Sequence, residues 1–379
     1  MSYLEYSVKR VPTGLRKILH FNWALVVLLS SIAAIGILML YSVAGGDFGQ
    51  WAEPQLKRFL TGLAIMIAMG FVPIWFWRNM AGVAYLGSIM LLIGVELFGA
   101  VGMGAQRWID IGPLRIQPSE LMKVALVMML AAYYDWLDPR RTSRPLWVLI
   151  PVVMILAPVA LVLRQPDLGT SLMLIGGGAA VMLVAGVHWA YFATVIAATG
   201  GAIASVFLSR GTPWQVLQDY QYRRIDTFLD PSSDPLGAGY HINQAKIAIG
   251  SGGWGGKGFM EGTQSRLNFL PEKHTDFIFN ILAEEFGFVG GVSLLVLYGL
   301  VIAFCLATAV QNRDRFASLV VVGIAASFFF YFAVNLAMVM GLAPVVGKPL
   351  PLVSYGGSAM LVVLMGFGLV QSAHVHRAR

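Results

Sequence analysis

The sequence predicts an all-α, polytopic integral membrane protein with about ten transmembrane helices. Of its 379 residues, 58% are hydrophobic and only 12% are charged, and the mean hydropathy is +0.73. Soluble domains usually carry about a quarter charged residues. Apolar windows of about 19 residues, long enough to cross a bilayer, recur along the whole chain.

These windows set the expected helices and the domain organisation. We expect spans near residues 23–42, 59–77, 81–101, 119–134, 147–163, 169–186, 190–208, 276–304, 316–340 and 357–373. The first is expected to be retained, because its apolar stretch exceeds the roughly 7–15 residues of a cleavable signal peptide. Residues 1–379 then form a single integral membrane domain, within which residues 209–275 form one long extracytoplasmic loop.

The basic residues predict the orientation and the kind of partner. They are in excess on the short segments that share a side with both chain ends, so both termini are expected in the cytoplasm. Half of the 26 lysines and arginines nevertheless fall on the outer side once the long loop is included. This outward charge favours an anionic partner, unless the cations only pair with acidic residues of the same loop.

Composition and spacing also exclude several classes of function. The net charge of +7 does not indicate nucleic-acid binding, because the basic residues are dispersed among loops. Cys305 is the single cysteine, which excludes a disulfide framework and a cysteine metal site. The run GSGGWGGKG at 250–258 does not fit a phosphate-binding loop, because Ser251 and Gly258 occupy positions that require glycine and Ser or Thr. We interpret this run as a flexible hinge that follows a short amphipathic helix at the outer interface, within residues 237–253.

Titratable residues crowd the start of one predicted span, in FLPEKHTDFIFNILAEEFG at 269–287. Asp276, Asn280 and Glu284 follow at i, i+4 and i+8 and are expected to share one helix face. Asp276 also fits the alternative role of helix N-cap. A charge inside the bilayer costs roughly 2.5–3.5 kcal/mol, so Glu284 and Glu285 are expected to face protein or a cavity.

Three further clusters are expected on the same outer side. They lie in GAQRWIDIGPLRIQPSELMK (104–123), RQPDLGTS (164–171) and GLAPVVGKPLPLVSYGGS (341–358). Each has a structural alternative: an intrahelical ion pair in the first, a charged turn in the second and a re-entrant loop packed in protein in the third. If the clusters form one site, its outward-facing cations suit the pyrophosphate of a lipid substrate. The carboxylates beneath them suit the transfer of a proton. These residues alone do not distinguish transport from catalysis.

These motifs, in this order and over nearly the whole chain, resemble those of the shape, elongation, division and sporulation (SEDS) family. The stretch GTQSRLNFLPEKHTDFIFNILAEE at 262–285 is most similar to the elongation members. The resemblance implies a peptidoglycan glycosyltransferase that polymerises lipid II at the outer face of the cytoplasmic (inner) membrane. It also implies a class B penicillin-binding protein as the transpeptidase partner.

The resemblance also implies the site residues. The essential acid of the family falls on Asp276, which we expect to act as general base on the acceptor hydroxyl. The expected substrate-binding residues are Arg107, Glu120, Lys123, Asp167, Arg266, Lys273, His274 and Ser354. Among them, Arg107, Lys123, Arg266 and Lys273 are candidates to neutralise the departing pyrophosphate, with Glu120 orienting Lys123. Lys273 stands where relatives often have arginine, which keeps the charge but loses the planar fork.

Cofactor and partner expectations complete the hypothesis. The sequence contains no evident metal site, although a divalent cation (Mg²⁺ or Mn²⁺) on the pyrophosphate stays an open alternative. Expected partners are lipid II, the growing glycan strand, the penicillin-binding protein and membrane lipids, with no nucleic acid. Two alternatives remain: a lipid II flippase, which requires polar residues through the membrane depth, and a non-catalytic scaffold, which would tolerate Asp276→Asn.

Overall fold

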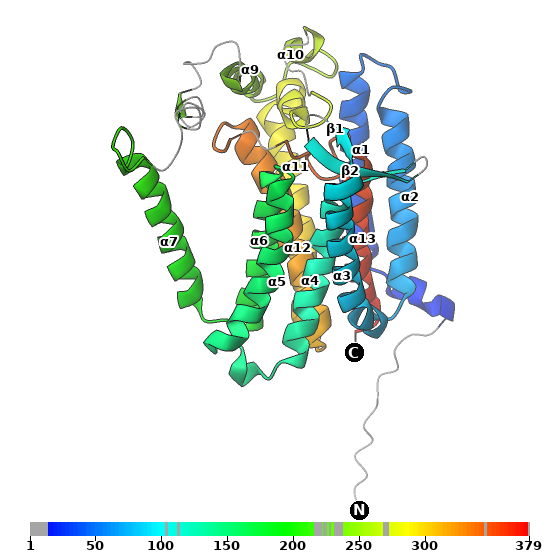
Figure 1. The fold of residues 1–379 in the computed structure, drawn as a ribbon. Helices are drawn as coiled ribbons and strands as arrows, with labels where there is room; N and C mark the ends of the chain where they lie inside the picture. The colour runs from blue at the N-terminus through cyan, green and yellow to red at the C-terminus, as the bar shows by residue number, and fades with distance from the viewer. Residues whose placement is uncertain are drawn as a thin grey trace, which may run out of the picture.

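The computed structural model describes residues 14–102, 105–111, 114–215, 222, 226, 229–230, 238–267, 273–344 and 347–377. Within these residues a bundle of long helices runs along one axis (Figure 1). The long helices are α1 (Trp23–Val43), α2 (Ala52–Phe71), α3 (Ile74–Phe98), α4 (Pro118–Trp136), α5 (Pro145–Arg164), α6 (Leu168–Ala185), α7 (Trp189–Leu208), α11 (Ile278–Gln311), α12 (Arg315–Val339) and α13 (Gly357–Val375). Shorter elements are η1 (Gly14–His20), η2 (Pro139–Arg141), α9 (Ala238–Ser251) and α10 (Thr263–Arg266).

Each expected span corresponds to one long helix, so the predicted fold class is confirmed. Within the described residues, 8 of these helices are long and apolar enough to cross a membrane. The other two, α2 and α4, carry charged residues in their first turns and pack against α13 and α3, respectively.

Two span boundaries were predicted too late in the chain. The windows at 59–77 and 81–101 correspond to α2 and α3, which begin at Ala52 and Ile74. The polar first turns of α2, with Glu53 and Lys57, lowered the hydropathy of its true start. Pro73 lies inside the first window, yet it ends the extended link after α2 and is the N-cap of α3.

A small antiparallel sheet, which the sequence analysis did not predict, connects α3 to α4. Its strands are β1 (Ala100–Gly102), β2 (Ala105–Ile111) and β3 (Leu114–Ile116), in the order β1-β2-β3. Ala100 pairs with Trp108, and Ile109 pairs with Ile116. Because successive side chains of a strand point to opposite faces, Arg107 and Trp108 on β2 are directed apart. The sheet lies toward the end of the bundle that also holds α9 and α10 (Figure 1).

Helix packing in the bundle depends on small residues at close approaches. A Cβ atom on Gly368 of α13 would lie 2.8 Å from the Cβ of Met69 of α2, so glycine permits the close contact of these helices. The start of α1 lies beside the end of α13, where the backbone N–H of Asn22 donates to Gln371 Oε1 at 3.0 Å. Helix α7 has no buried residue and leans away from the bundle in Figure 1.

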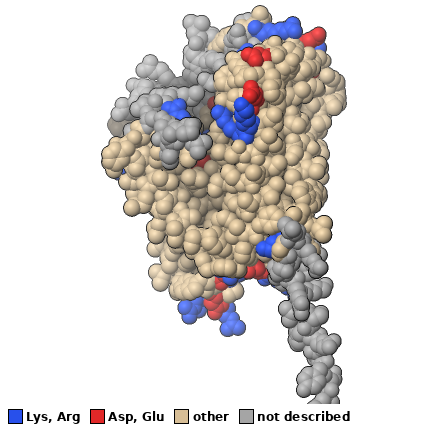
Figure 2. Space-filling view, turned by 90° about the vertical axis from the view of Figure 1, so that its right-hand side faces the viewer, with Lys and Arg blue, Asp and Glu red and all other residues tan. Residues whose placement is uncertain are grey.

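Charged side chains gather toward the two ends of the molecule, with a broad belt of uncharged residues between them (Figure 2). This distribution is the one that a bilayer requires. The short helix predicted within residues 237–253 is confirmed as α9.

Candidate active site

Two ionisable residues of α4 form an ion pair inside the bundle. Lys123 Nζ lies 2.7 Å from Glu120 Oε2, and the side chains are only 6% and 1% exposed. The residues follow at i and i+3, as the sequence predicts, and the first turns of α4 place them beneath the sheet. Buried charges are tolerated when they are paired and hydrogen-bonded. The pairing therefore offsets the free-energy cost of burying the two charges. This is the structural alternative that the sequence analysis left open for Glu120 and Lys123.

A second buried ion pair joins α6 to the segment before α13. Lys348 Nζ lies 2.9 Å from Asp167 Oδ2, and these side chains are 4% and 1% exposed. Asp167 is also the N-cap of α6, where its Oδ1 accepts from the backbone N–H of Thr170 at 3.0 Å. Gln117 donates to Asp167 Oδ2 at 3.1 Å. Asp167 thus connects α4, α6 and the Lys348 segment, instead of lying in an isolated charged turn.

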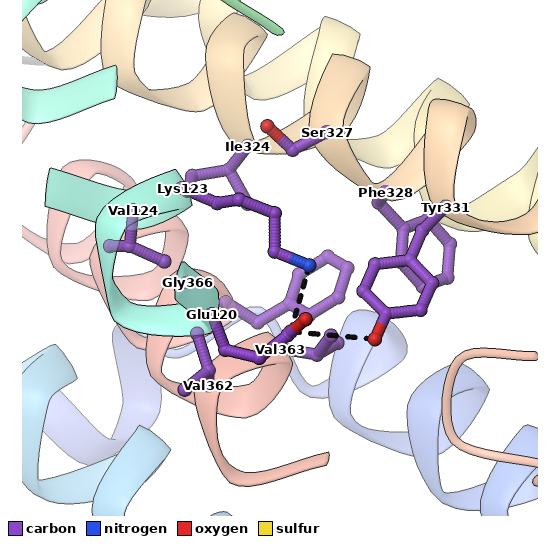
Figure 3. A pocket seen from close by; sticks show the side chains of 11 residues that line it. Glu120, Lys123, Val124, Ile324, Ser327, Phe328, Tyr331, Val362, Val363 and Gly366 are labelled. Atoms are coloured by element: carbon purple, nitrogen blue, oxygen red, sulfur yellow. Dashed lines mark hydrogen bonds and ion pairs between the residues drawn. The ribbon is translucent and has the colours of Figure 1, made fainter. Parts of the chain in front are cut away.

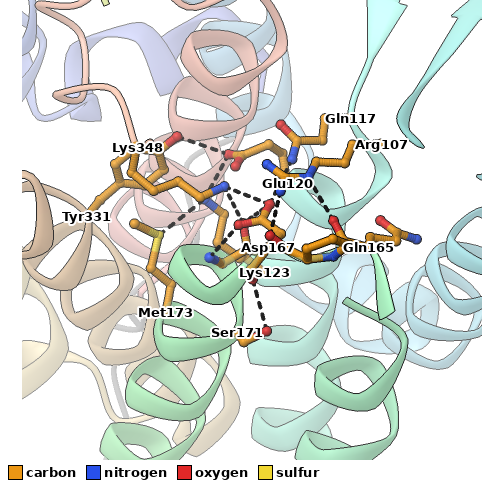
Figure 4. A network of polar contacts seen from close by, with 12 residues as sticks. Arg107, Gln117, Glu120, Lys123, Gln165, Asp167, Ser171, Met173, Tyr331 and Lys348 are labelled. Atoms are coloured by element: carbon orange, nitrogen blue, oxygen red, sulfur yellow. Dashed lines mark hydrogen bonds and ion pairs between the residues drawn. The ribbon is translucent and has the colours of Figure 1, made fainter. Parts of the chain in front are cut away.

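The two ion pairs belong to one polar network, drawn in Figure 4. Lys123 Nζ lies 3.7 Å from Met173 Sδ of α6 and 3.9 Å from the centre of the Tyr331 ring of α12. Tyr331 in turn donates to Glu120 Oε2 at 3.4 Å. An ammonium over an aromatic face is stabilised by the ring quadrupole. Side chains from α4, α6 and α12 therefore surround the Lys123 ammonium.

A pocket opens beside this network, between α4, α12 and α13 (Figure 3). Glu120, Lys123 and Tyr331 bring polar atoms to it, and the other labelled side chains of Figure 3 are mostly apolar. The pocket thus combines an apolar wall with a few convergent polar groups, the arrangement that is typical of ligand sites. The space inside it is about 30 Å³, room for about two water molecules.

Arg107 of β2 contacts the turn that carries Asp167. Its Nε donates to the Gln165 carbonyl at 2.8 Å, and its Nη2 donates to the Pro166 carbonyl. A planar guanidinium holds two neighbouring acceptors in a fixed fork, whereas an ammonium is a compact charge on a flexible chain. The structure therefore gives Arg107 a contact with the QPD turn, and its expected role in substrate binding stays a prediction.

Asp276 lies in the turn 273–277, immediately before α11. The predicted N-cap role is wrong, because Phe277 is the N-cap and no side chain caps this helix end. The expectation that Asp276, Asn280 and Glu284 share one helix face is also wrong, since Asp276 precedes the helix. A Cβ atom on Gly347 would lie only 3.5 Å from Asp276 Oδ2. The carboxylate is therefore next to the segment that carries Lys348.

Hydrogen bonds hold the Asp276 turn against that segment. Ser354 Oγ donates to the Thr275 carbonyl and accepts from the backbone N–H of Leu350 at 2.7 Å. The N–H of Tyr355 donates to the His274 carbonyl at 2.9 Å. Ser354 is buried, so the structure gives it a positioning contact, and its expected substrate contact stays a prediction. This irregular segment is packed in protein, as was predicted for a re-entrant loop.

His274 belongs to an aromatic cluster that the sequence analysis missed. Its ring stacks on Trp51 at 4.2 Å between centroids, and Trp51 meets the Tyr355 ring edge-on at 4.8 Å. The Arg58 guanidinium lies 4.4 Å from the centre of the Tyr355 ring. Trp51 is the N-cap of α2 and Arg58 lies in its second turn, so both precede the span expected at 59–77. The charged residues in the first turns of α2 lowered the hydropathy there, so the sequence showed no sign that the helix had already begun.

Two of the predicted cations lie away from the buried ion pairs. Arg266 is the last residue of α10 and is exposed. Lys273 lies partly buried at the start of the Asp276 turn, where burial lowers the pKa of its ammonium group below the ordinary value. The structure thus groups four of the predicted residues in one network (Figure 4): Arg107, Glu120, Lys123 and Asp167. His274 and Asp276 lie in the adjoining turn, and Ser354 packs against that turn.

Lys348 is the main residue that the sequence analysis missed. In the sequence it is one of several basic residues in outer loops. Its place in the proline-rich run GKPLPL was nevertheless a usable sign of a buried lysine. An ammonium in a segment packed in protein needs a carboxylate partner.

Glu284 and Glu285 face protein, as expected, but they bind the outer segment 252–266 and α1. Glu284 Oε1 accepts from Lys257 Nζ at 2.6 Å and from the N–H of Thr263 at 2.9 Å. Ser42 of α1 donates to Glu285 Oε1. The two acids therefore fix the outer segment on α11.

The glycine-rich run is docked at a kink in α11, in place of the flexible hinge that we predicted. Gly287 has φ 65° and ψ −159°, which breaks the helix. The N–H groups of Lys257 and Gly258 donate to the carbonyls of Glu284 and Glu285 at 3.0 and 3.1 Å. The glycines here permit backbone-to-backbone contact.

The carboxylates of the two buried ion pairs, Glu120 and Asp167, each have a lysine partner. Within the described ranges, no group of three or more His, Cys, Asp or Glu side chains could hold a metal ion. Mg²⁺ is also bound through one or two carboxylates together with the phosphates of a substrate, so a divalent cation on the pyrophosphate stays a prediction. The lysine ammonium groups can neutralise an anion, and a neighbouring carboxylate can accept a proton.

Comparison with known proteins agrees with these motifs. The sequence profile of the cell cycle protein family FtsW/RodA/SpoVE matches residues 22–379. The chain is 42% identical over 360 residues to the peptidoglycan glycosyltransferase MrdB of Escherichia coli K12, covering 94% of each chain.

Solved structures agree as well. A chain from a peptidoglycan synthase complex, described as coordinating polymerization and crosslinking, matches with a TM-score of 0.80 and 32% identity. That match covers 93% of this chain and 97% of the other. The rod shape determining protein RodA of Thermus thermophilus matches with a TM-score of 0.70 and 30% identity, over 95% of this chain and 98% of its own. Since profile, identity and fold agree over nearly the whole chain, the protein belongs to the FtsW/RodA/SpoVE family.

Proposed function

We propose that this protein is a peptidoglycan glycosyltransferase that polymerises lipid II into glycan strands during cell elongation. Its relative MrdB, which is 42% identical, carries the name of this activity. We place the reaction at the outer face of the cytoplasmic membrane, because the polyprenyl chain of lipid II lies in the bilayer while its sugars lie in water. The sheet that leads into α4 lies toward the end of the bundle that holds α9 and α10 (Figure 1).

One observation supports this activity above all others. The turn that carries Asp276 packs directly against the segment whose lysine is paired inside the bundle, with Gly347 beside the Asp276 carboxylate. A glycosyl transfer from a pyrophosphate requires both a base and cations at neighbouring positions. The juxtaposition supplies candidates for both roles.

The proposed reaction is a single displacement. Asp276 accepts the proton of the 4-hydroxyl of GlcNAc while the oxygen attacks C1 of MurNAc, and the bond from C1 to the undecaprenyl pyrophosphate breaks. A positioned base contributes roughly 10²–10⁴-fold to such a step. One displacement inverts C1 from the α-linked pyrophosphate to a β-linked chain, so no covalent enzyme intermediate is needed.

Cations stabilise the charge that develops on the leaving pyrophosphate. Lys348 lies on the segment next to Asp276, and Lys123 lies within the network below it. In the protein without substrate, the carboxylates of Asp167 and Glu120 balance these charges. This pairing reduces the free-energy cost of burying the two lysine side chains. Lys273, partly buried in the Asp276 turn, is a third candidate. In this proposal lysines fulfil the role that a divalent cation has in other transferases.

A class B penicillin-binding protein is the proposed partner. The support is the solved peptidoglycan synthase complex, whose description joins polymerization to crosslinking and whose matching chain shares the fold of this one. Crosslinking requires a transpeptidase, an activity distinct from the glycosyl transfer proposed here. The partner would supply that activity on the strand made here.

The experiment that tests this proposal is glycan polymerisation from purified lipid II in detergent. Wild type and Asp276→Asn would each be copurified with the penicillin-binding partner, with its transpeptidase blocked. We expect polymer from wild type and none from an intact, partner-bound Asp276→Asn protein. No polymer from either would favour a flippase or a scaffold. Polymer from both would keep the enzyme and remove Asp276 as its base.

A further inference from the structure

Asn335 of α12 is a fully buried polar residue whose amide group contacts two backbone segments. Its Nδ2 donates to the carbonyl of Asp276 at 2.9 Å and to the carbonyl of Lys348 at 2.6 Å. The side chain is 0% exposed. A primary amide has two N–H groups, so one side chain can satisfy both acceptors at the same time.

The two carbonyls belong to the residues on which the proposed reaction depends. Asp276 is the proposed base, and Lys348 is a proposed cation for the leaving group. Both lie in irregular backbone, since the turn 273–277 precedes α11 and residues 347–350 have no regular secondary structure. Such segments have no internal ladder of hydrogen bonds, so tertiary contacts determine their relative position.

The same helix also contacts the second ion pair. Tyr331 precedes Asn335 by four residues, which places the two side chains on one face of α12. Tyr331 lies against the Lys123 ammonium and donates to Glu120. One face of α12 therefore contacts the base-bearing turn, the Lys348 segment and the Glu120–Lys123 pair.

We propose that Asn335 is a positioning residue for the polymerisation reaction: its amide fixes the base-bearing turn relative to the Lys348 segment. This inference rests on the proposed function. Without the amide the two segments keep the contacts that Ser354 and Tyr355 provide. The chain therefore still folds, but the base and the cation no longer hold a fixed separation.

Asn280 of α11 provides a matched control. It is also 0% exposed and its Nδ2 donates to the carbonyl of Ala245 at 2.8 Å; among the described residues its Oδ1, like that of Asn335, has no hydrogen-bond partner. The Asn280 amide connects α11 to α9, whereas the Asn335 amide connects the turn of the proposed base Asp276 to the segment of Lys348. A comparison of Asn335→Leu with Asn280→Leu therefore separates the loss of a buried amide from the loss of this particular contact.

The test measures initial rates of glycan polymerisation at varied lipid II concentration, with each variant copurified with its penicillin-binding partner. We expect kcat of Asn335→Leu to fall about 100-fold, the order expected for a displacement of about 1 Å, with KM nearly unchanged. Asn280→Leu is expected to stay within about threefold of wild type in kcat while its melting temperature falls to a similar extent. Asn335→Gln, which keeps both donors, is expected to recover part of the activity.

The outcomes separate this inference from the proposed function. If wild type polymerises and the two leucine variants have equal kcat, Asn335 has only a structural role and the inference is wrong. A rise in KM with unchanged kcat would also overturn it. If wild type makes no polymer under the same conditions, the proposed function itself fails. Should Asn335→Leu not fold, Asn335→Ser and Asn280→Ser replace the two leucine variants: a lower kcat in Asn335→Ser alone supports the inference, and equal kcat in the two serine variants overturns it.

Discussion

Lys348 Nζ lies 2.9 Å from Asp167 Oδ2, and this contact joins the start of α6 to the irregular segment before α13. Neither residue is exposed to solvent by more than 3%. The pair fixes one wall of the candidate active site, since the Lys348 segment also packs against the Asp276 turn. It also gives the buried Lys348 side chain a carboxylate partner close to the Asp276 turn.

The first prediction separates these two roles of Lys348. Lys348→Met leaves Asp167 as an uncompensated buried charge, so we expect the free energy of unfolding to fall by about 3–5 kcal/mol. Polymerisation is expected to fall by at least about 100-fold, the cost of one group that stabilises a developing charge. Melting temperature and the initial rate from lipid II measure the two effects.

The matched control is the double variant Lys348→Met/Asp167→Asn. It removes both charges, so most of the lost stability should return while the activity stays low. A double variant with activity near that of wild type would contradict a direct role of Lys348 in the reaction.

The second prediction concerns pH. Burial lowers the pKa of Lys273 below its ordinary value, and a lysine is charged only below its pKa. The cation is therefore lost as the pH rises, at a lower pH than for an exposed lysine. Arginine stays protonated throughout this range. We expect Lys273→Arg to keep its polymerisation rate to a more alkaline pH than wild type.

The measurement is the initial rate as a function of pH on the alkaline side, for wild type and Lys273→Arg. Lys57→Arg is the control, because Lys57 is 72% exposed and pairs with Glu53 on the surface of α2. Superimposable profiles for wild type and Lys273→Arg would show that the charge of Lys273 does not limit the reaction.

The sequence predicts local relationships well and long-range ones poorly. The Glu120–Lys123 pair follows from i, i+3 spacing on a helix, and the structure confirms it. The partner of Asp167 is far along the chain and depends on the path of the 347–356 segment, which no periodicity encodes. Asn335 was visible in the sequence only as a polar residue in an apolar span. Its role requires the two carbonyls that the fold brings to it.

Turns and irregular segments account for most errors in the predicted elements. In the sheet β1-β2-β3 the strands β1 and β3 have only three residues each, so period-two alternation has too little length to be recognised there. The face predicted for Asp276 assumed that the helix starts at residue 276, whereas α11 starts at Ile278. Asp276 therefore lies in a turn, where helical spacing does not determine the direction of its side chain.

The third prediction concerns the planar fork of Arg107. Arg107→Lys keeps the charge but loses the rigid fork that contacts the carbonyls of Gln165 and Pro166 at the same time. Loss of one such hydrogen bond, worth about 1 kcal/mol, is expected to displace the Asp167 turn and lower the polymerisation rate about tenfold. The initial rate from lipid II tests this expectation.

Arg115→Lys provides the comparison, because Arg115 of β3 is exposed and its guanidinium lies 5.7 Å from the centre of the Trp108 ring. We expect its rate to stay within about threefold of wild type, since exposed contacts contribute little. Equal losses in the two variants would mean that the sheet as a whole, and not the Arg107 fork, determines the rate.

The last prediction tests the docking of the outer segment on the kink of α11. A Cβ atom on Gly256 would lie 2.1 Å from the Glu285 carbonyl oxygen, and its φ of 82° disfavours any L side chain. Gly256→Ala must therefore displace the segment or strain the backbone, at a cost of about 1–3 kcal/mol.

Gly255→Ala is the matched variant, since a Cβ atom there meets nothing within 4 Å. We expect a lower melting temperature and faster proteolysis of the outer segment for Gly256→Ala alone, because its neighbours Lys257 and Gly258 would lose their hydrogen bonds to α11. Equal stability of the two variants would show that the segment is not held at the kink, and Glu284 would then lack its lysine partner.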